Sequence, residues 1–192
     1  MMAFRVVLVA GLMSLPGLAL AQTAQPAPPT GAQRDFAALK GLAGSWIGRF
    51  TVTPAMPGMD SQGQARVILR ITSRGNALVH EMQGVGEGDD PLKYDHPVTM
   101  FYLNDDQLNL IHYCDAGNRP HMVAKPSADG RTVEFDFVDI TGNTQRGHMQ
   151  HARITVIDAN HHSEEWTFLI PGNKLMKANM DLTREAGAGS GK

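Results

Sequence analysis

Short runs of alternating apolar and polar residues occupy most of the chain after residue 45. In RTVEFDFVD (131 to 139), for example, Val133, Phe135 and Phe137 are separated by polar residues. This period-two alternation is typical of a strand with one buried face. Turn sequences such as SADGR and IPGNK separate the runs, and they favour tight hairpins. The predicted strands are 46–52, 64–72, 76–84, 97–103, 107–114, 119–125, 131–139, 148–157, 161–170 and 174–183.

So many short strands in one small domain favour a closed sheet. An open sheet would expose long unpaired edges, whereas a barrel has none. An up-and-down barrel of about ten strands also encloses space for a ligand. We therefore expect an all-β fold, a closed antiparallel barrel, preceded by a short helical turn in DFAALKGLAG (35 to 44).

The N-terminal residues have the pattern of an export signal. A positive charge at Arg5 precedes an apolar stretch from Val6 to Leu15, and Ala19-Leu20-Ala21 supplies a small-residue cleavage site. We interpret residues 1–21 as a signal peptide and expect a periplasmic or secreted protein. The Pro- and Gln-containing segment 22–34 is predicted to be a disordered leader, residues 35–185 a single barrel domain, and residues 186–192 a disordered tail.

Composition excludes several classes of partner. The formal net charge of −2 over 192 residues argues against a nucleic-acid or anionic-membrane partner. After Ala21, no stretch reaches the roughly 18 to 20 apolar residues of a membrane-spanning helix. The one cysteine, Cys114, cannot form an internal disulfide. It is either a small buried hydrophobe or part of a site, and no partner protein is evident.

The first predicted strand carries a family resemblance. Gly44-Ser45-Trp46, which follows the helical turn, resembles the G-x-W signature of lipocalin and calycin-type barrels. The resemblance implies that Arg184, a basic residue after the last strand, packs over the ring of Trp46. The layout from LAGSW through HYCDAGN and GHM to EEWTF also resembles uncharacterised exported bacterial proteins of a lipocalin-like family of unknown function. It covers residues 41–184 and implies a barrel with a cavity, with no reaction attached.

Strand parity directs a set of polar side chains into the predicted lumen. In QLNLIHYC (107 to 114), Leu108, Leu110, His112 and Cys114 share one face, which leaves Tyr113 on the other face or at the rim. A bulge would invert such an assignment. Mostly apolar walls with a few polar groups are typical of a small-molecule site. Counted in the same way, the inward polar residues are His80, His112, Cys114, His148, Gln150, His162 and Glu164.

Two further features belong to the predicted mouth of the barrel. Arg119 follows the turn DAGN, and its planar donors suit a carboxylate or another anionic group. The segment 86–97 is the longest connection after the leader, so we expect a flexible lid there.

The sequence leaves three functions open. The leading hypothesis is an exported protein that binds a small apolar or amphipathic ligand in the barrel lumen. The second is a metal or haem site. His112 and Cys114, with His148 or His162, would supply ligands suited to zinc or copper, whereas no residue is matched to a haem ligand. The third is an isomerase or hydrolase that uses a lumen histidine or Glu164 as general acid or base. No P-loop, GxSxG, HExxH or CxxC motif is present, so neither a cofactor nor an enzyme class is assigned.

Overall fold

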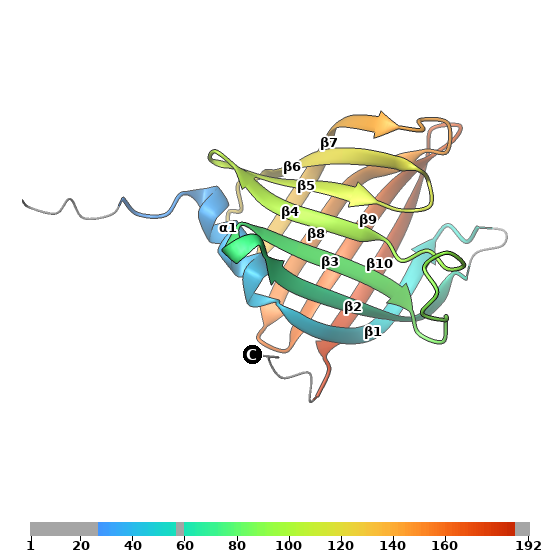
Figure 1. Cartoon of the computed structure of the whole chain (residues 1–192), viewed down its shortest axis with the longest axis horizontal. Coiled ribbons are helices and arrows are strands. Elements are labelled where there is room, and N and C mark those ends of the chain that lie inside the picture. The colour runs from blue at the N-terminus through green and yellow to red at the C-terminus, as the bar shows by residue number, and fades with distance from the viewer. Residues whose placement is uncertain (1–26, 57–59, 187–192) are drawn as a thin grey trace, which may run out of the picture.

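Ten antiparallel strands form a closed barrel in the computed structural model, which describes residues 27–56 and 60–186. The strands follow one another around the barrel in chain order, and β10 pairs with β1 to close it (Figure 1). The predicted fold class is confirmed, and each predicted strand overlaps an observed one. The predicted signal peptide lies outside the described residues. The elements are α1 (Gly31–Gly41), β1 (Gly44–Thr53), β2 (Gln62–Thr72), the short helical turn η1 (Ser73–Gly75), β3 (Ala77–Gly84), β4 (Val98–Asn104), β5 (Gln107–Tyr113), β6 (Asn118–Lys125), β7 (Thr132–Gly142), β8 (His148–Asp158), β9 (His161–Ile170) and β10 (Lys174–Arg184).

The helix α1 covers one end of the barrel (Figure 1). It begins at Gly31, within the segment predicted to be a disordered leader, because Thr30 and Gln33 form a reciprocal capping box. Its buried face presents Phe36 and Leu39 to the core. We call this end, with the connections 105–106, 126–131 and 159–160, the helix end. The opposite end, with the connections 85–97, 114–117 and 143–147, is the open end.

Trp46 and Arg184 seal the helix end. The two residues are partners in the β1–β10 register, and the Arg184 guanidinium carbon lies 4.1 Å from the centroid of the fully buried Trp46 ring. The indole N–H donates to the Leu42 carbonyl over 2.7 Å, and the guanidinium donates to the Ala43 carbonyl over 2.9 Å. Gly44 has a φ of 140°, which glycine adopts without strain. The stacking that the resemblance implied is therefore present.

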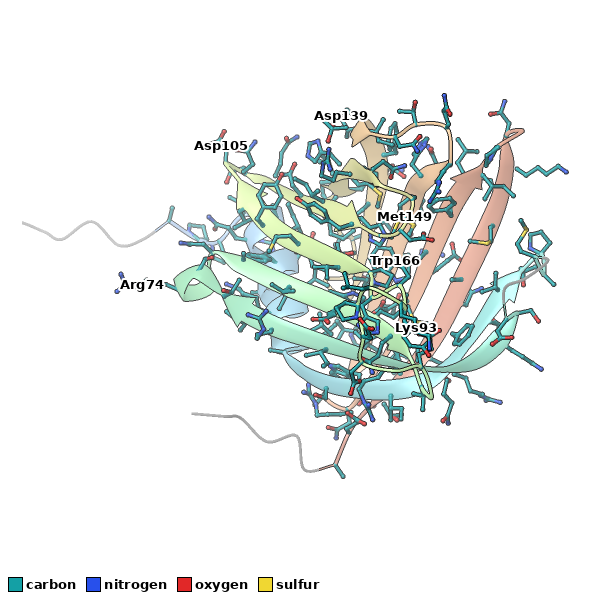
Figure 2. All side chains as sticks on the ribbon, turned by 45° about the vertical axis from the view of Figure 1, so that its right-hand side comes forward. Arg74, Lys93, Asp105, Asp139, Met149 and Trp166 are labelled. Atoms are coloured by element: carbon teal, nitrogen blue, oxygen red, sulfur yellow. The ribbon has the colours of Figure 1, made fainter. Side chains whose placement is uncertain are left out.

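Inward side chains are fully buried near the helix end, whereas some of those toward the open end are only partly buried. Near the helix end, inward side chains such as Phe101, Val133 and Leu182 are fully buried. Toward the open end, the inward side chains of Met82 and Phe168 are only partly buried. Figure 2 labels Met149 and Trp166 among the side chains inside the barrel. Solvent therefore reaches the interior wall from the open end.

Within the two described ranges, no helix has the length and apolar character that crossing a membrane requires.

Candidate functional site

Three adjacent strands place polar side chains at one level of the lumen. His80 on β3 is opposite Thr99 on β4, and Thr99 is opposite His112 on β5. Their exposed fractions are 3%, 1% and 5%. We call these three residues the polar row. Because residues that are register partners face the same side of a sheet, the row is a continuous polar strip on the inner wall.

The opposite wall contributes a buried carboxylate. His162, Glu164 and Trp166 alternate along β9, so they share its inner face. The carboxylate of Glu164 accepts hydrogen bonds from His80 Nε2 at 3.0 and 3.2 Å, His162 Nε2 at 3.0 Å and Trp166 Nε1 at 2.7 Å. We call these four residues the Glu164 cluster. Since β3 and β9 are not neighbours, the contact between His80 and Glu164 crosses the lumen.

The Glu164 cluster keeps its carboxylate ionised. Burial by itself would raise the pKa of Glu164, but the charge on His80 and the hydrogen bonds from His162 and His80 outweigh it, so the pKa lies below its ordinary value. An ionised carboxylate can only accept hydrogen bonds. Both imidazoles therefore carry a hydrogen on Nε2 and keep Nδ1 as the second nitrogen. The Nδ1 atom of His162 is buried and has no partner among the described residues.

His112 is a neutral imidazole. Burial, and then the charge on His80, lower the pKa of His112 from 6.5 to about 3. Its Nδ1 lies 2.8 Å from the hydroxyl oxygen of the buried Thr99. The hydroxyl is satisfied when it donates to Nδ1, which assigns the ring hydrogen to Nε2. No hydrogen bond joins that Nε2–H to another residue in the described part of the chain.

Trp166 provides an apolar surface between the two histidines of the row. Its ring centroid lies 5.5 Å from that of His80 and 5.8 Å from that of His112. Trp166 has the same parity in β9 as His162 and Glu164, which were predicted to face inward, whereas nothing in the sequence singled out Thr99. Two signals identify Thr99. It is the register partner of His112, and it shares the inward face of β4 with the buried Phe101.

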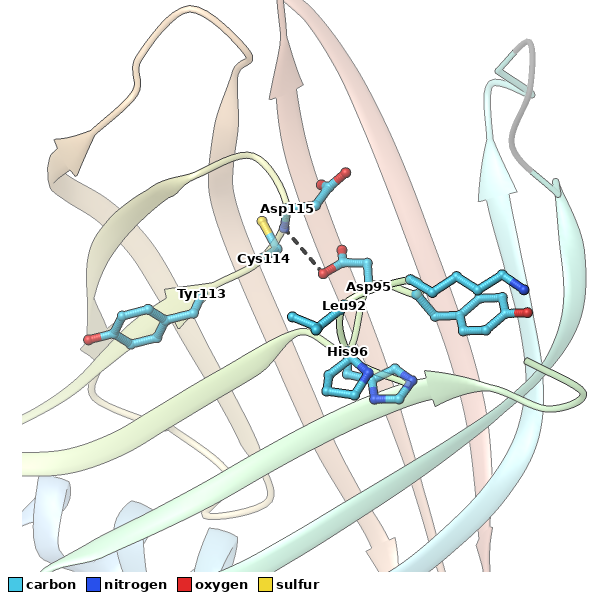
Figure 3. A pocket seen from close by; sticks show the side chains of 9 residues that line it. Leu92, Asp95, His96, Tyr113, Cys114 and Asp115 are labelled. Carbon is cyan, nitrogen blue, oxygen red and sulfur yellow. Dashed lines mark hydrogen bonds between the residues drawn. The ribbon is translucent and has the colours of Figure 1, made fainter. Parts of the chain in front are cut away.

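A second hollow lies at the open end. A cavity of about 440 Å³ separates the 85–97 loop from the end of β5 (Figure 3). The Asp115 backbone N–H donates to Asp95 Oδ1 over 3.2 Å, which ties the loop to the barrel. Burial and then the Asp115 charge raise the pKa of Asp95. The lining residues are Pro91, Leu92, Lys93, Tyr94, Asp95, His96, Tyr113, Cys114 and Asp115.

Cys114 belongs to this rim cavity and not to the polar row. It follows Tyr113, the last residue of β5, and is half-buried. Burial raises the pKa of its thiol, so the protonated form predominates and the thiol is a weak nucleophile.

His148 is not part of the lumen site, contrary to the parity prediction. A bulge in β8 between Met149 and His151 shifts the register against β9, so Met149 is the partner of Phe168. Met149 is consequently buried in the core. The His148 ring packs on Phe137 with centroids 4.3 Å apart, and its Nε2 contacts Gln150 Oε1 at 3.1 Å.

Arg119 lies on the outer face of β6, contrary to the prediction that it meets a ligand at the mouth. Asn118, Pro120 and Met122 are buried along this strand, while Arg119 is exposed. Its Nε donates to the Thr141 hydroxyl over 3.1 Å. The Arg119 guanidinium therefore lies on the outer surface of the barrel.

The predicted metal ligands are not assembled. His112 contacts Thr99, Cys114 lines the rim cavity and His162 contacts Glu164. In residues 27–56 and 60–186, no group of three or more histidine, cysteine, aspartate or glutamate side chains is placed to hold a metal ion. These donors do not form the predicted zinc or copper site.

Comparisons with known proteins assign this chain to no family. Neither the protein-family models nor the curated proteins gave a match. Among solved structures, a protein of unknown function from the DUF3598 family of Nostoc punctiforme is similar, with 10% sequence identity and a TM-score of 0.41. The match covers 77% of this chain and 48% of that one. The chain thus spans about half the length of the solved structure that it resembles.

Proposed function

We propose that the barrel binds a small, mainly apolar molecule, and that an uncharged polar group of this molecule contacts the polar row. The observation that carries the proposal is the contact of the Thr99 hydroxyl with His112 Nδ1, which leaves Nε2 as the available donor beside the apolar surface of Trp166. Apolar walls supply affinity and a few fixed polar groups supply orientation in small-molecule sites. The open end, where inward side chains are partly exposed, is the proposed route of access.

The charge state of His112 selects the ligand class. A neutral imidazole can donate to a ketone, an amide or a hydroxyl group. It gives no ionic partner to a carboxylate, and burying an unpaired ion is strongly unfavourable. Arg119, the residue first assigned to an acidic group, points to the outer surface. An uncharged ligand is therefore preferred over a fatty acid or another anion.

The proposal also includes a calycin-like barrel. Its support is the Gly44-x-Trp46 sequence together with the Arg184 guanidinium stacked on the tryptophan ring. Barrels with this signature are the ones that the sequence resembles.

Export to the periplasm or the medium is proposed from residues 1–21 alone. The intact mass of the protein expressed in a Gram-negative host and recovered from the periplasm tests it. We expect the mass of a chain cleaved after Ala21. A full-length chain confined to the cytoplasm would remove this part of the proposal.

Ligand class is tested with probes of matched chain length. We would measure binding of 2-octanone, 2-octanol and octanoate to the barrel by ligand-observed NMR. We expect the ketone and the alcohol to bind at least tenfold more tightly than octanoate, a difference of about 1.4 kcal/mol. His112→Phe should remove most of this preference, while His151→Phe should keep it, because His151 pairs with Asp136 on the outer face. Equal or tighter binding of octanoate would contradict the proposal.

A further inference from the structure

The contact between Glu164 and His80 has the geometry of a proton-transfer pair. Both carboxylate oxygens lie near His80 Nε2, at 3.2 and 3.0 Å. Because the ionised carboxylate accepts from Nε2–H, Nδ1 points away from Glu164, and it is this atom that carries the lone pair when the His80 ring is neutral. No hydrogen bond joins this Nδ1 to another residue of the described ranges. A carboxylate that holds one ring N–H fixes the tautomer of a histidine base and stabilises the imidazolium that it forms.

His112 supplies the complementary group in the same polar row. His80 and His112 are both partners of Thr99, so their Cα atoms are about 10 Å apart, two strand spacings. Both rings contact Trp166, which brings the side chains toward a shared region. The hydrogen-bond partner of His80 is a carboxylate, and that of His112 is a hydroxyl group. Environments that differ in this way assign one imidazole to accept a proton and the other to donate a hydrogen bond.

We infer that the barrel catalyses proton transfer at the carbon next to a carbonyl group, with His80 as the base and the Nε2–H of His112 as the donor to the carbonyl oxygen. The inference rests on the proposed function, because the carbonyl compound must occupy the proposed binding site. Glu164 is a positioning residue that acts through His80. The reaction class is enolisation, and therefore isomerisation wherever the neighbouring carbon can take up the proton.

The step is balanced without a co-reactant. The lone pair of His80 Nδ1 takes the proton, the C–H electrons form a carbon–carbon double bond, and the carbonyl π electrons move to oxygen. The His112 Nε2–H hydrogen bond stabilises the charge that develops on that oxygen. The His80 imidazolium, which faces Glu164, then returns a proton to carbon. In deuterated water the Nδ1 proton first exchanges with solvent, so the ketone gains deuterium and the solvent gains protium.

The arrangement favours proton transfer over hydrolysis. The hydroxyl in the polar row belongs to Thr99, and its hydrogen-bond partner is His112 and not His80. The thiol of Cys114 lines the rim cavity. Neither group is therefore activated as a nucleophile by the Glu164–His80 pair. Glu164 is itself a poor base, because three N–H donors occupy its oxygens.

The test is exchange of the α-hydrogens of 2-octanone in deuterated water, followed by proton NMR at saturating ketone. The wild-type protein should exchange these hydrogens much faster than an equal concentration of free imidazole. His80→Gln keeps an N–H donor for Glu164 but removes the base, and should slow exchange by about 100-fold or more, the usual contribution of a general base. Glu164→Gln should lower the rate at saturation and leave the affinity for 2-octanone nearly unchanged. The control His151→Phe should leave both quantities unchanged.

Binding and exchange are read in the same samples, so the two proposals fail separately. Bound 2-octanone that exchanges no faster with wild-type protein than with His80→Gln would overturn the inference and leave the proposed function standing. Absence of ketone binding would overturn both. If the variants do not fold, the nitrogen-15 spectrum of the wild-type protein decides. A hydrogen on Nε2 and none on Nδ1 of His80 supports the inference, and a hydrogen on Nδ1 contradicts it.

Discussion

His112 links the chemistry of the polar row to the stability of the fold. The pKa of His112 is about 3 in the folded protein, compared with an ordinary value of 6.5. Below pH 6.5 the imidazole is therefore protonated in the unfolded chain but stays neutral in the folded chain. The stability from the neutral imidazole is therefore fully present above pH 6.5 and is lost as the pH falls toward the folded pKa. The lowered pKa of Glu164 also makes the protein less stable as the pH falls, but only below about pH 4.5, the ordinary pKa of this group.

We predict that the free energy of unfolding falls between about pH 6.5 and pH 5, with a slope of up to about 1.4 kcal/mol per pH unit from His112. Urea unfolding of the wild-type protein and of His112→Phe at several pH values measures this slope. The variant should lose most of it while it keeps a folded barrel, because phenylalanine does not titrate. An unchanged slope in the variant would show that His112 is not the titrating group.

A second prediction for a single residue concerns Trp46. The ring is fully buried, stacks on Arg184 and donates to the Leu42 carbonyl. Trp46→Ala should destabilise the protein by about 3 to 5 kcal/mol, as aromatic truncations in cores do. Arg184→Leu should have a smaller effect, because it removes a cation–π contact of about 0.5 to 2 kcal/mol and hydrogen bonds to the partly exposed carbonyls of Ala43 and Ala159. Chemical denaturation of both variants gives the comparison, and an unchanged midpoint for Trp46→Ala would contradict the sealing role.

At the scale of elements, alternation predicted the inner faces where a strand is regular. In β5 and β9, His112, His162 and Glu164 are buried, as parity predicts. In β8 the count failed, because one extra residue between Met149 and His151 reverses the two sides of the strand. A bulge depends on the pairing with the neighbouring strand, which alternation along one strand does not report. Arg119 was assigned from its chemistry, whereas its buried neighbours place it outside.

Contacts across the lumen could not be predicted from the sequence. The hydrogen bond between His80 and Glu164 joins β3 and β9, which lie on opposite walls. Their approach depends on strand number, tilt and stagger, and these determine which levels of the two walls face each other. Parity therefore identified both residues as inward but did not pair them.

One prediction for a structural element concerns the 85–97 loop. Asp95 accepts a hydrogen bond from the Asp115 backbone, while burial and the charge of the Asp115 side chain raise its pKa. Asp95→Asn keeps an acceptor oxygen and removes the charge, so the loop should close more tightly over Cys114. We expect the reaction of Cys114 with a thiol reagent to slow by on the order of a few-fold, as for a partly exposed charge pair. Asp89→Ala, an exposed substitution in the same loop, is the control. Faster labelling of Asp95→Asn would contradict this account of the loop.

At the scale of the whole molecule, the two ends of the barrel differ. The helix end is sealed by α1, Trp46 and Arg184, whereas inward side chains near the open end remain partly exposed. The polar row and the Glu164 cluster lie between these regions, and their hydrogen bonds tie opposite walls together. This asymmetry supports the open end as the proposed route of access to His80 and His112.

The most direct measurement is native mass spectrometry of the wild-type protein purified without denaturation, beside His112→Phe and the control His151→Phe. We predict that the wild-type protein and the control retain a small, uncharged, mainly apolar molecule in stoichiometric amount, and that folded His112→Phe has lost it. A wild-type barrel that carries no molecule and takes up neither 2-octanone nor 2-octanol would contradict the account, as would equal retention by His112→Phe.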